Sequence, residues 1–528
     1  MHLRTTKRLA LVLAAAALAL AACGGSSDDD SDAAPGDGLT SASPRAGGSL
    51  TINIVTESRG LDPFTGAMSS VTDYSRLNAL YDVLVYADGK TGEIKPQIAE
   101  ALTTPDGGRT WQLVVRDGVK FSDGTVFDAA AVKFTWDRMA DPANRSLYAS
   151  SLRGVTTEVA DARTLRISLA QPNARFDQIV AANLAYVVSP TAYQKDPKGF
   201  SRQPVGAGPF LLKSWQQGVQ QTYGRNPGYW QAGKPYLDEL VFKTVTDQTQ
   251  SFNSVDTGGS DMAITLDSRN ANLAKDAGMD VTELALNGPG GVLFNMAKAP
   301  LDDPRAREAL TLAIDPDGFN KIMYDGKVVT PKSLFAVTST QIDQNAVPTP
   351  RQDTAKAAAL AKQLADEGKP LNVTLMMPQS TNSGKTGEYL QQQWNLVPNI
   401  NVKIDYVDIN AMMAKVLVGK DYQAAYYNLA TPAEPVLWNA LHSKSPANWL
   451  NYSSPDADAA LEASRTATTP EDLKAAYTRL AQVTSRDFLM IPLQESITYV
   501  YAKRGKFGGL ELTSGAGILM DRLGRSGT

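Results

Sequence analysis

The stretch GRTWQLVVRDGVKFSDGTVFDAAAVKFTWDRM, residues 108–139, holds the clearest information about the fold. Trp111, Leu113 and Val115 alternate with polar residues, a pattern that predicts a half-buried strand. Residues 116–118 (Arg-Asp-Gly) follow at once and are typical of a turn. The segment therefore starts with a strand that has one buried face.

The rest of this stretch predicts a second strand and a helix. Val119 and Phe121 are expected to begin a strand that the Ser-Asp-Gly of residues 122–124 ends with another turn. Asp128 is in a position to cap a helix. Apolar residues recur on one face of that helix, at Val132, Trp136 and Met139. Nothing in this order of strand, turn, strand, turn and helix suggests catalysis.

Length and composition describe a large globular protein. Its 528 residues exceed what one hydrophobic core usually serves, so two or three lobes are expected. The chain is 43% hydrophobic and 20% charged, and its formal net charge is −4. A mildly acidic chain without basic clusters argues against nucleic acid as a partner. Beyond the N-terminus no apolar run is long enough to span a membrane.

The N-terminal segment predicts export. Positive residues at 4, 7 and 8 precede an apolar run from Leu9 to Ala22, which suits the apolar region of a signal peptide. The run ends in Leu20-Ala21-Ala22-Cys23-Gly24, which resembles a bacterial lipobox and implies cleavage before Cys23 and lipidation of its thiol. The alternative is an ordinary secretory signal with an incidental cysteine. Because Cys23 is the only cysteine, we expect no disulfide in the exported chain.

Residues 23–48 are expected to form a disordered tether, because Gly, Ser, Asp and Pro dominate their composition. The folded part then begins near Ser49. Leu50, Ile52 and Ile54 alternate as in a strand, and residues 73–84 have the spacing of a helix.

The C-terminal half alternates strand and helix patterns. Strands are expected over residues 371–376, 401–407 and 422–428, and helices over residues 354–367, 387–396, 409–418 and 470–485. This alternation predicts an α/β protein with a mostly parallel sheet covered by helices.

Several short motifs, in their order, resemble those of one family. They are the 108–139 block, Leu61-Asp62-Pro63, PQIAEA (96–101), PVGAGPF (204–210), RNPGYW (225–230), Pro300 to Asp315 and Ile491-Pro492-Leu493. The family is the large extracytoplasmic solute-binding proteins of ABC importers, the type that includes dipeptide-, oligopeptide- and nickel-binding members. The resemblance covers the chain from about Ser49 to about Lys506.

The resemblance implies a two-lobed periplasmic-binding-protein fold of class II, with an extra inserted subdomain and two crossing strands as the hinge. The implied division is a signal peptide (1–22), the tether (23–48), lobe I (49–80, 206–294 and 491–528), an inserted subdomain (81–205) and lobe II (295–490). Residues 287–291 (Asn-Gly-Pro-Gly-Gly) precede the expected crossing at Phe294-Asn295 and are either hinge residues or an ordinary loop.

Residues suited to catalysis are scarce. Once the signal is removed, His442 is the only histidine, and no nucleophile motif surrounds it. We interpret it as a surface or loop histidine. Clustered ligands for a structural zinc and a phosphate-binding glycine loop are both missing from the sequence, so neither a metal nor a cofactor is expected. Trp438 and Trp449 are expected in the core.

The resemblance also implies which residues contact the ligand. Tyr148 matches a tyrosine that peptide-binding relatives present from the inserted subdomain, with a packed subdomain tyrosine as the alternative. Residues 426–431 and the following loop match the segment of lobe II that lines the cleft. This gives Tyr426, Tyr427, Asn428, Thr431 and Glu434 as ligand-binding candidates. The two adjacent tyrosines must face opposite sides of a strand, so we expect one in the core and one towards ligand.

The sequence departs from the peptide-binding pattern at one important place. Thr431 stands where peptide-binding relatives carry an aspartate for the peptide ammonium, and a neutral hydroxyl cannot make that charge-assisted bond. Val416 stands where some relatives carry an arginine for the carboxylate, beside Lys415. A non-peptide solute such as an oligosaccharide, an opine or a metal chelate is therefore the alternative to a peptide.

Taken together, these features predict a receptor that captures a peptide or peptide-like solute and delivers it to a membrane permease without altering it. The resemblance implies a monomer on the extracytoplasmic face of the bacterial membrane, lipid-anchored through Cys23. A surface hydrolase or an envelope-assembly lipoprotein is the alternative from another class.

Overall fold

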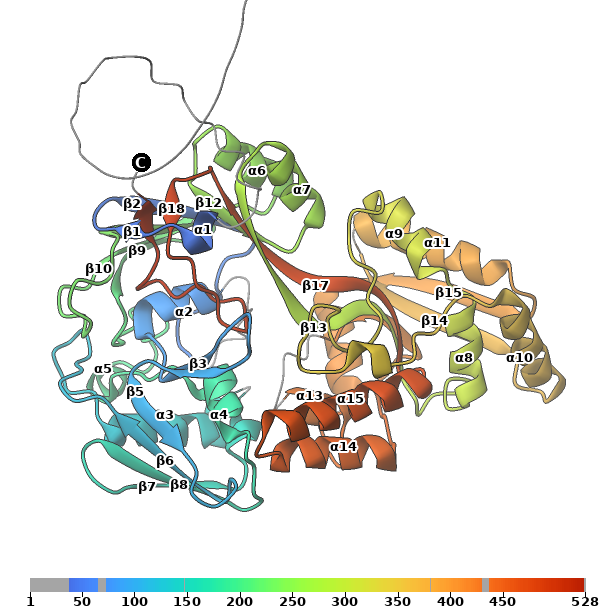
Figure 1. Ribbon diagram of the computed structural model, residues 1–528, viewed down its shortest axis with the longest axis horizontal. Coiled ribbons are helices and arrows are strands. Elements are labelled where there is room, and N and C mark those ends of the chain that lie inside the picture. The colour runs from blue at the N-terminus through green and yellow to red at the C-terminus, as the bar shows by residue number, and fades with distance from the viewer. Residues whose placement is uncertain (1–37, 65–72, 147, 380, 430–435, 527–528) are drawn as a thin grey trace, which may run out of the picture. The chain divides into compact units, whose positions relative to one another are not determined.

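The computed structural model describes residues 38–526 except 65–72, 147, 380 and 430–435. A ten-stranded sheet runs through this part of the chain, in the order β15-β14-β16-β13-β17-β12-β2-β11-β10-β9 (Figure 1). Its strands are β2 (Ser49–Ile54), β9 (Phe210–Gln216), β10 (Gln220–Arg225), β11 (Glu239–Thr244), β12 (Met262–Thr265), β13 (Asp280–Phe294), β14 (Leu371–Pro378), β15 (Ile400–Val407), β16 (Ala424–Asn428) and β17 (Met490–Ala502).

Two long antiparallel strands, β13 and β17, connect the two ends of this sheet (Figure 1). At one end of the pair Asp280 lies opposite Ala502, and β12 adds to β17 there. At the other end Leu293 lies opposite Met490, and β16 adds to β13. The same two strands therefore belong to both halves of the sheet, and we call them the crossing strands.

We use lobe I for the half on the β12 side. One continuous hydrophobic cluster runs from Leu39 to Ile264 and returns at Val500 to Leu523. The other strands of this half form small sheets: β5 (Ala99–Thr103), β6 (Thr110–Val115), β7 (Val155–Val159) and β8 (Thr164–Leu169); β3 (Val85–Ala87) and β4 (Ile94–Pro96); and β1 (Pro44–Arg45), β18 (Phe507–Gly508) and β19 (Gly524–Ser526). Its helices are α1 (Gly38–Ser41), α2 (Tyr74–Tyr81), α3 (Ala129–Ala140), α4 (Phe176–Ile179), α5 (Pro190–Lys195), α6 (Gln248–Asp256) and α7 (Ser268–Asp276), with short turns η1 (Pro142–Asn144), η2 (Ala149–Leu152) and η3 (Val180–Leu184).

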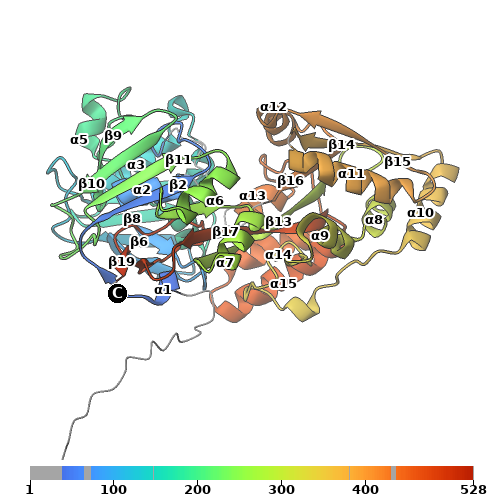
Figure 2. The ribbon, with the colours of Figure 1, turned by 90° about the horizontal axis from the view of Figure 1, so that it is seen from above.

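We use lobe II for the half on the β16 side. The predicted parallel sheet is confirmed, since β14 pairs in parallel with both β15 and β16. Separate hydrophobic clusters pack on its two faces. One face carries α8 (Pro304–Leu312), α9 (Pro316–Tyr324), α10 (Thr354–Asp366) and α11 (Thr381–Asn395). The other carries α12 (Ile409–Met413), η5 (Ala414–Gly419), α13 (Val436–Leu441), α14 (Pro455–Thr466) and α15 (Pro470–Arg486). α13, α14 and α15 are labelled in Figure 2, and η4 (Gln344–Ala346) contacts α15.

Aspartate side chains begin many of these helices. The Asp128 carboxylate accepts a hydrogen bond of 2.8 Å from the Ala131 N–H, which confirms the predicted cap of α3. The same arrangement recurs at the start of α6, α7, α8, α9 and α10, through Asp247, Asp267, Asp303, Asp315 and Asp353. Each cap satisfies a backbone N–H that the helix itself cannot pair.

Three expectations from the sequence are wrong. Residues 38–48 do not belong to a disordered tether, because α1 buries Leu39 completely and β1 pairs with β19. Val119 and Phe121 are buried but begin no strand, since this segment makes only the isolated bridge Lys120–Val126. The helix expected over 73–84 ends at Tyr81, because Asp82 adopts a positive φ of 56°.

Residues 287–291 lie inside β13 and form neither a free loop nor a regular strand. The register against β17 shifts between Leu286 and Gly290 and again between Gly290 and Gly291. Gly288 has a φ of +88°, and a Cβ at Gly291 would collide with the carbonyl oxygen of Ile491. Glycine is therefore needed at 288 for the backbone conformation and at 291 because the Ile491 carbonyl oxygen leaves no room for a side chain.

Candidate functional site

A cavity of about 410 Å³ lies beside the crossing strands and is lined from both lobes. Lobe I contributes Thr265 and Ser268, lobe II contributes Tyr324, Thr386 and Tyr426, and β17 contributes Gln494. We call it the interlobe cavity. Another cavity, of about 350 Å³, is lined by residues of lobe II and β17 alone.

The topology of the sheet explains why these residues meet. Val55 and Thr56 directly follow β2, and Thr265 is the last residue of β12. β2 and β12 are parallel, so their carboxyl ends lie at the same edge. In open α/β sheets, ligands usually bind at this edge. The cap residue Asp267 then starts α7 at the cavity wall.

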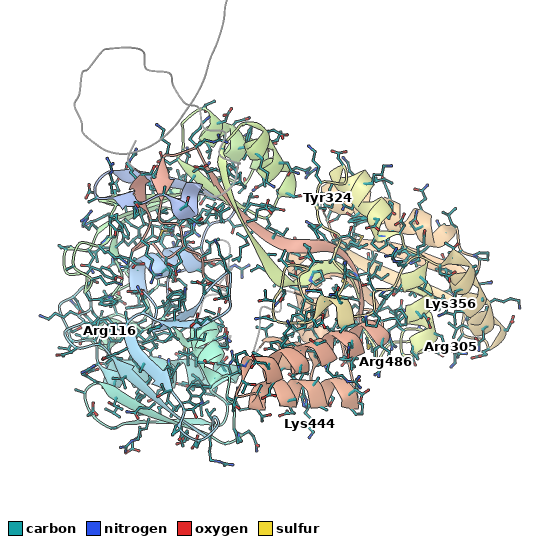
Figure 3. The ribbon with its side chains drawn as sticks, in the orientation of Figure 1. Arg116, Arg305, Tyr324, Lys356, Lys444 and Arg486 are labelled. Carbon is teal, nitrogen blue, oxygen red and sulfur yellow. The ribbon has the colours of Figure 1, made fainter. Side chains whose placement is uncertain are left out.

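Hydrogen bonds fix several polar side chains of the cavity wall. Tyr324 is the last residue of α9 and is labelled in Figure 3. Its hydroxyl donates to the Gln494 Oε1 of β17 over 2.7 Å. The Thr265 hydroxyl donates to the Gln248 Oε1 over 2.6 Å and accepts from the Asp267 N–H over 2.9 Å. The wall thus consists mainly of neutral groups held in fixed positions.

The charges of the wall belong to one pair. Among its described lining residues the charged ones are Asp267 and Arg269, and the Arg269 guanidinium lies 3.3 Å from the Asp267 carboxylate. Burial raises the pKa of Tyr324 to about 12; Arg269 lowers that pKa and Asp267 raises it. Burial also raises the pKa of Tyr426, while its hydrogen bond with Thr386 lowers it. Both tyrosines are therefore neutral, and each offers a hydroxyl.

The structure separates the two adjacent tyrosines of β16 as expected. Tyr426 lines the interlobe cavity and packs against the cluster that contains Trp394. Tyr427 packs against the cluster on the other face, with its ring 6.0 Å from that of Trp449. Their roles towards a ligand stay predictions.

The other predicted ligand residues do not line this cavity. Asn428 is exposed and donates to the Ser496 hydroxyl over 2.6 Å. Tyr148 is half-buried at the start of η2 and is not among the residues that line the interlobe cavity. Cys23, Thr431 and Glu434 lie outside the described residues.

His442 follows α13 in a loop, but the expectation that it could be a surface residue is wrong, because its exposed fraction is 3%. Its Nδ1 accepts from the Lys444 N–H over 3.1 Å, so Nε2 carries the proton and faces the Glu462 carboxylate at 3.2 Å. Its ring stacks on Trp438, with centroids 4.5 Å apart. The histidine is thus a packed, hydrogen-bonded residue. Trp449 is in the core as expected, whereas Trp438 is partly buried.

Sequence reasoning missed most of the cavity wall. Thr56 and Thr265 could have been found, because each directly follows or ends a buried strand, where side chains meet at the sheet edge. Tyr324, Thr386 and Gln494 carry no such local signal. Among the described residues no group of three or more His, Cys, Asp or Glu side chains is arranged to hold a metal. Within the same residues, no helix combines the length and apolarity that a membrane span requires.

One curated relative is similar to this chain over part of its length. The glutathione-binding protein GsiB of Salmonella paratyphi A is 32% identical over 316 residues, which cover 60% of this chain and 61% of the relative. The match thus spans less than two thirds of that protein.

Solved structures show the same fold at low sequence identity. The binding protein DppA of Helicobacter pylori, in complex with the peptide STSA, has a TM-score of 0.78 at 21% identity, over 92% of this chain and 99% of that one. AgaA of A. tumefaciens R10, in complex with agropinic acid, has a TM-score of 0.76 at 20% identity, over 91% and 99%. These likenesses establish the two-lobed periplasmic-binding fold.

The model of the bacterial extracellular solute-binding proteins, family 5 Middle, matches residues 93–460, well over half of the chain. The match includes the 108–139 block, the whole of the crossing strand β13 and most of lobe II. The chain belongs to family 5 of the bacterial extracellular solute-binding proteins.

Proposed function

We propose that this protein is the solute receptor of an ABC importer and that it holds a peptide-like solute in the interlobe cavity. The observation that carries the proposal is the cavity itself, because lobe I, lobe II and β17 all contribute to its wall. A solute that contacts both lobes stabilises the arrangement in which they face each other. A permease then recognises that arrangement and receives the solute.

The chemistry of the wall favours a ligand with amide or hydroxyl groups. Tyr324, Tyr426, Thr386 and Gln494 offer neutral donors and acceptors, and the volume of about 410 Å³ suits a molecule of a few residues. The relative GsiB is named for glutathione, which is a tripeptide-like solute of this size. A short peptide or a modified peptide is therefore the leading ligand class.

A non-peptide solute is the second candidate. Asp267, the one carboxylate among the described lining residues, already faces Arg269. Thr431 replaces the aspartate that peptide-binding relatives use for the ligand ammonium. A ligand without a free ammonium, such as an opine, would need neither carboxylate, and AgaA binds agropinic acid on this fold.

We further propose that the protein is a non-enzymatic, monomeric lipoprotein on the outer side of the cell membrane. The lipobox-like run before Cys23 supports the anchor. Expression in a bacterial host fed with a labelled fatty acid tests it: the wild type should carry the label, and Cys23→Ser should carry none. Label on the variant, or no label on the wild type, would contradict lipidation at Cys23.

The test of the main proposal is native mass spectrometry of freshly purified protein, followed by calorimetric titration of the emptied protein. Glutathione, the peptide STSA and agropinic acid represent the candidate classes. We expect one solute to bind at a ratio of one to one and to be recovered unchanged. Turnover of the solute, or failure of the protein to retain or bind any solute, would contradict the proposal.

A further inference from the structure

A third cavity lies on the other face of the crossing strands. It has a volume of about 390 Å³ and is lined by the turn of residues 88–92, by β13, by the loop of residues 336–341, and by Glu495 and Ile497 of β17. Side chains alternate along a strand, so Glu495 points away from the face on which Gln494 lines the interlobe cavity. We call this space the rear cavity, and it is separate from the proposed solute site.

Glu495 is a buried carboxyl group that forms no ion pair with the residues that the structure describes. Its exposed fraction is 6%, and its Oε1 accepts one long hydrogen bond, of 3.3 Å, from the Val337 N–H. Burial raises the pKa of Glu495 to about 7, and the Val337 hydrogen bond is the only interaction that opposes this. A carboxylate in such a place gains much from a cation within hydrogen-bond reach.

The other charged groups that line the cavity include two carboxylates that already have partners. On the 88–92 turn, Asp88 faces the Lys95 ammonium at 2.7 Å, and Lys90 is exposed. On β13, Glu283 is exposed and faces the Lys275 ammonium at 2.5 Å.

The remaining elements contribute neutral groups. The 336–341 loop carries no charged side chain, and its Gln341 accepts a hydrogen bond of 2.8 Å from the Asn287 amide. The Asn287 Oδ1 in turn accepts from the Ala336 N–H over 3.1 Å. Among the described carboxylates of this wall, Glu495 is therefore the one that faces no lysine or arginine in an ion pair, while Lys90 is an exposed cation on the same wall.

The rest of the wall combines hydroxyl and amide groups with aliphatic side chains, among them Leu284, Leu286, Val337 and Ile497. A metal ion would need several oxygen or nitrogen ligands, and the described residues contain no group of three such side chains. A primary ammonium group needs fewer oxygen acceptors than a metal ion needs ligands. A short hydrocarbon chain attached to it would pack against the aliphatic side chains.

We propose that the rear cavity is a binding site for a small primary amine, whose ammonium group pairs with the Glu495 carboxylate and whose hydrocarbon part contacts Leu284, Leu286 and Ile497. Such a ligand touches both crossing strands, the 88–92 turn of lobe I and the 336–341 loop of lobe II. The ammonium binds the ionised carboxylate, so it competes with a proton. Between pH 6 and pH 8 the ionised fraction of a group with a pKa of about 7 rises from about one tenth to about nine tenths, so affinity should rise about tenfold.

The test titrates the full exported chain with butylamine and putrescine at pH 6, 7 and 8, with the neutral butanol as a matched probe. We expect saturable binding of the amines that strengthens about tenfold over this range, and none of butanol. Glu495→Gln should lose the binding, and Glu367→Gln should keep it, because Glu367 is exposed, faces Arg305 and lies outside the rear cavity. No saturable binding of amine, equal binding of butanol, or unchanged binding by Glu495→Gln would each overturn the proposal.

A second measurement covers the case in which Glu495→Gln does not fold. In methyl-labelled wild-type protein, butylamine should shift the methyl resonances of Ile497, Leu284 and Leu286. Shifts confined to the residues around Tyr324 would place the amine in the interlobe cavity and overturn the proposal. Because no transported solute is used, the outcome does not depend on the proposed transport function.

Discussion

The Tyr324 hydroxyl donates a hydrogen bond of 2.7 Å to the side-chain oxygen of Gln494. This bond ties the end of α9 to the crossing strand β17 at the wall of the interlobe cavity. Any rotation about the crossing strands therefore acts on a side chain that the proposed solute touches. The bond therefore joins lobe II to a crossing strand at the wall of the proposed solute site.

Tyr324→Phe removes this bond and keeps the ring. We expect the free energy of unfolding to fall by about 1 kcal/mol and the affinity for the solute to fall severalfold, because Gln494 loses its fixed orientation. Calorimetric titration and urea unfolding measure the two effects. Tyr389→Phe is the matched control, since the Tyr389 hydroxyl donates to the Asp315 carbonyl over the same 2.7 Å away from the cavity. An equal loss of affinity in both variants would contradict a role of Tyr324 at the site.

The tyrosine pair of β16 offers a test within one strand. Tyr426→Phe removes a hydroxyl from the interlobe cavity, and Tyr427→Phe removes one from the opposite face. Solute affinity should fall severalfold in the first variant and stay unchanged in the second, as measured by titration. If Tyr427→Phe bound the solute more weakly than Tyr426→Phe, the solute would bind on the opposite face of the sheet, and the proposed site would be wrong.

Lobe I contains a buried carboxyl group that makes stability depend on pH. The Asp82 carboxylate accepts hydrogen bonds from the Tyr229 hydroxyl (2.7 Å) and the Trp230 indole N–H (2.9 Å). Burial first, and the charge of Asp521 second, raise the pKa of Asp82 from 3.8 to about 6. A raised pKa means that the folded state favours the proton. Its contribution to stability is therefore complete below about pH 3.8 and is lost as the pH rises through about 6.

Urea unfolding of the wild type and of Asp82→Asn between pH 4 and pH 8 measures this contribution. The stability of the wild type relative to the variant should decrease from pH 4 to pH 6 and level off above pH 7. Asp106→Asn is a control of opposite sign, because hydrogen bonds from Thr110 lower the pKa of Asp106. The free energy of unfolding of the wild type should rise relative to that of Asp106→Asn as the pH increases through the acidic range. If the difference in free energy of unfolding between wild type and Asp82→Asn did not change with pH, the pKa of Asp82 would not be raised in the folded protein.

The packed position of residues 38–48 predicts a stability effect at Leu39. Its side chain is fully buried in the lobe I cluster, and its carbonyl accepts from the Leu510 N–H over 2.9 Å. Leu39→Ala should lower the free energy of unfolding by about 2–5 kcal/mol, as measured by denaturant titration. An unchanged free energy of unfolding would indicate that residues 38–48 do not pack on lobe I and instead belong to the tether that their composition predicts.

The regular parts of the fold could be predicted from the sequence because their patterns are local. Alternation at Leu50, Ile52 and Ile54 predicted β2, and the helical pattern of residues 354–367 predicted α10. The strand and helix alternation after residue 371 gave the parallel sheet of lobe II. Each of these signals lies within a few residues of the element that it describes.

The failures come from contacts between distant residues. Leu39 lies in a polar stretch, and its burial depends on Leu510 and on the pairing of β1 with β19. His442 is buried because Trp438 stacks on it and Glu462 of α14 faces it. For the site, Tyr426 was predicted by resemblance, whereas Tyr324 and Gln494 meet only through tertiary packing. No local pattern in the sequence predicts a contact between residues that lie so far apart in the chain.

Hydrogen exchange of the emptied protein, with and without the solute identified by native mass spectrometry, tests the central claim most directly. Binding between the lobes should slow exchange in the segments that carry Thr56, Ser268 and Thr386, and therefore in both lobes at once. Solute binding with protection confined to one lobe, or around the 350 Å³ cavity of lobe II, would contradict the claim.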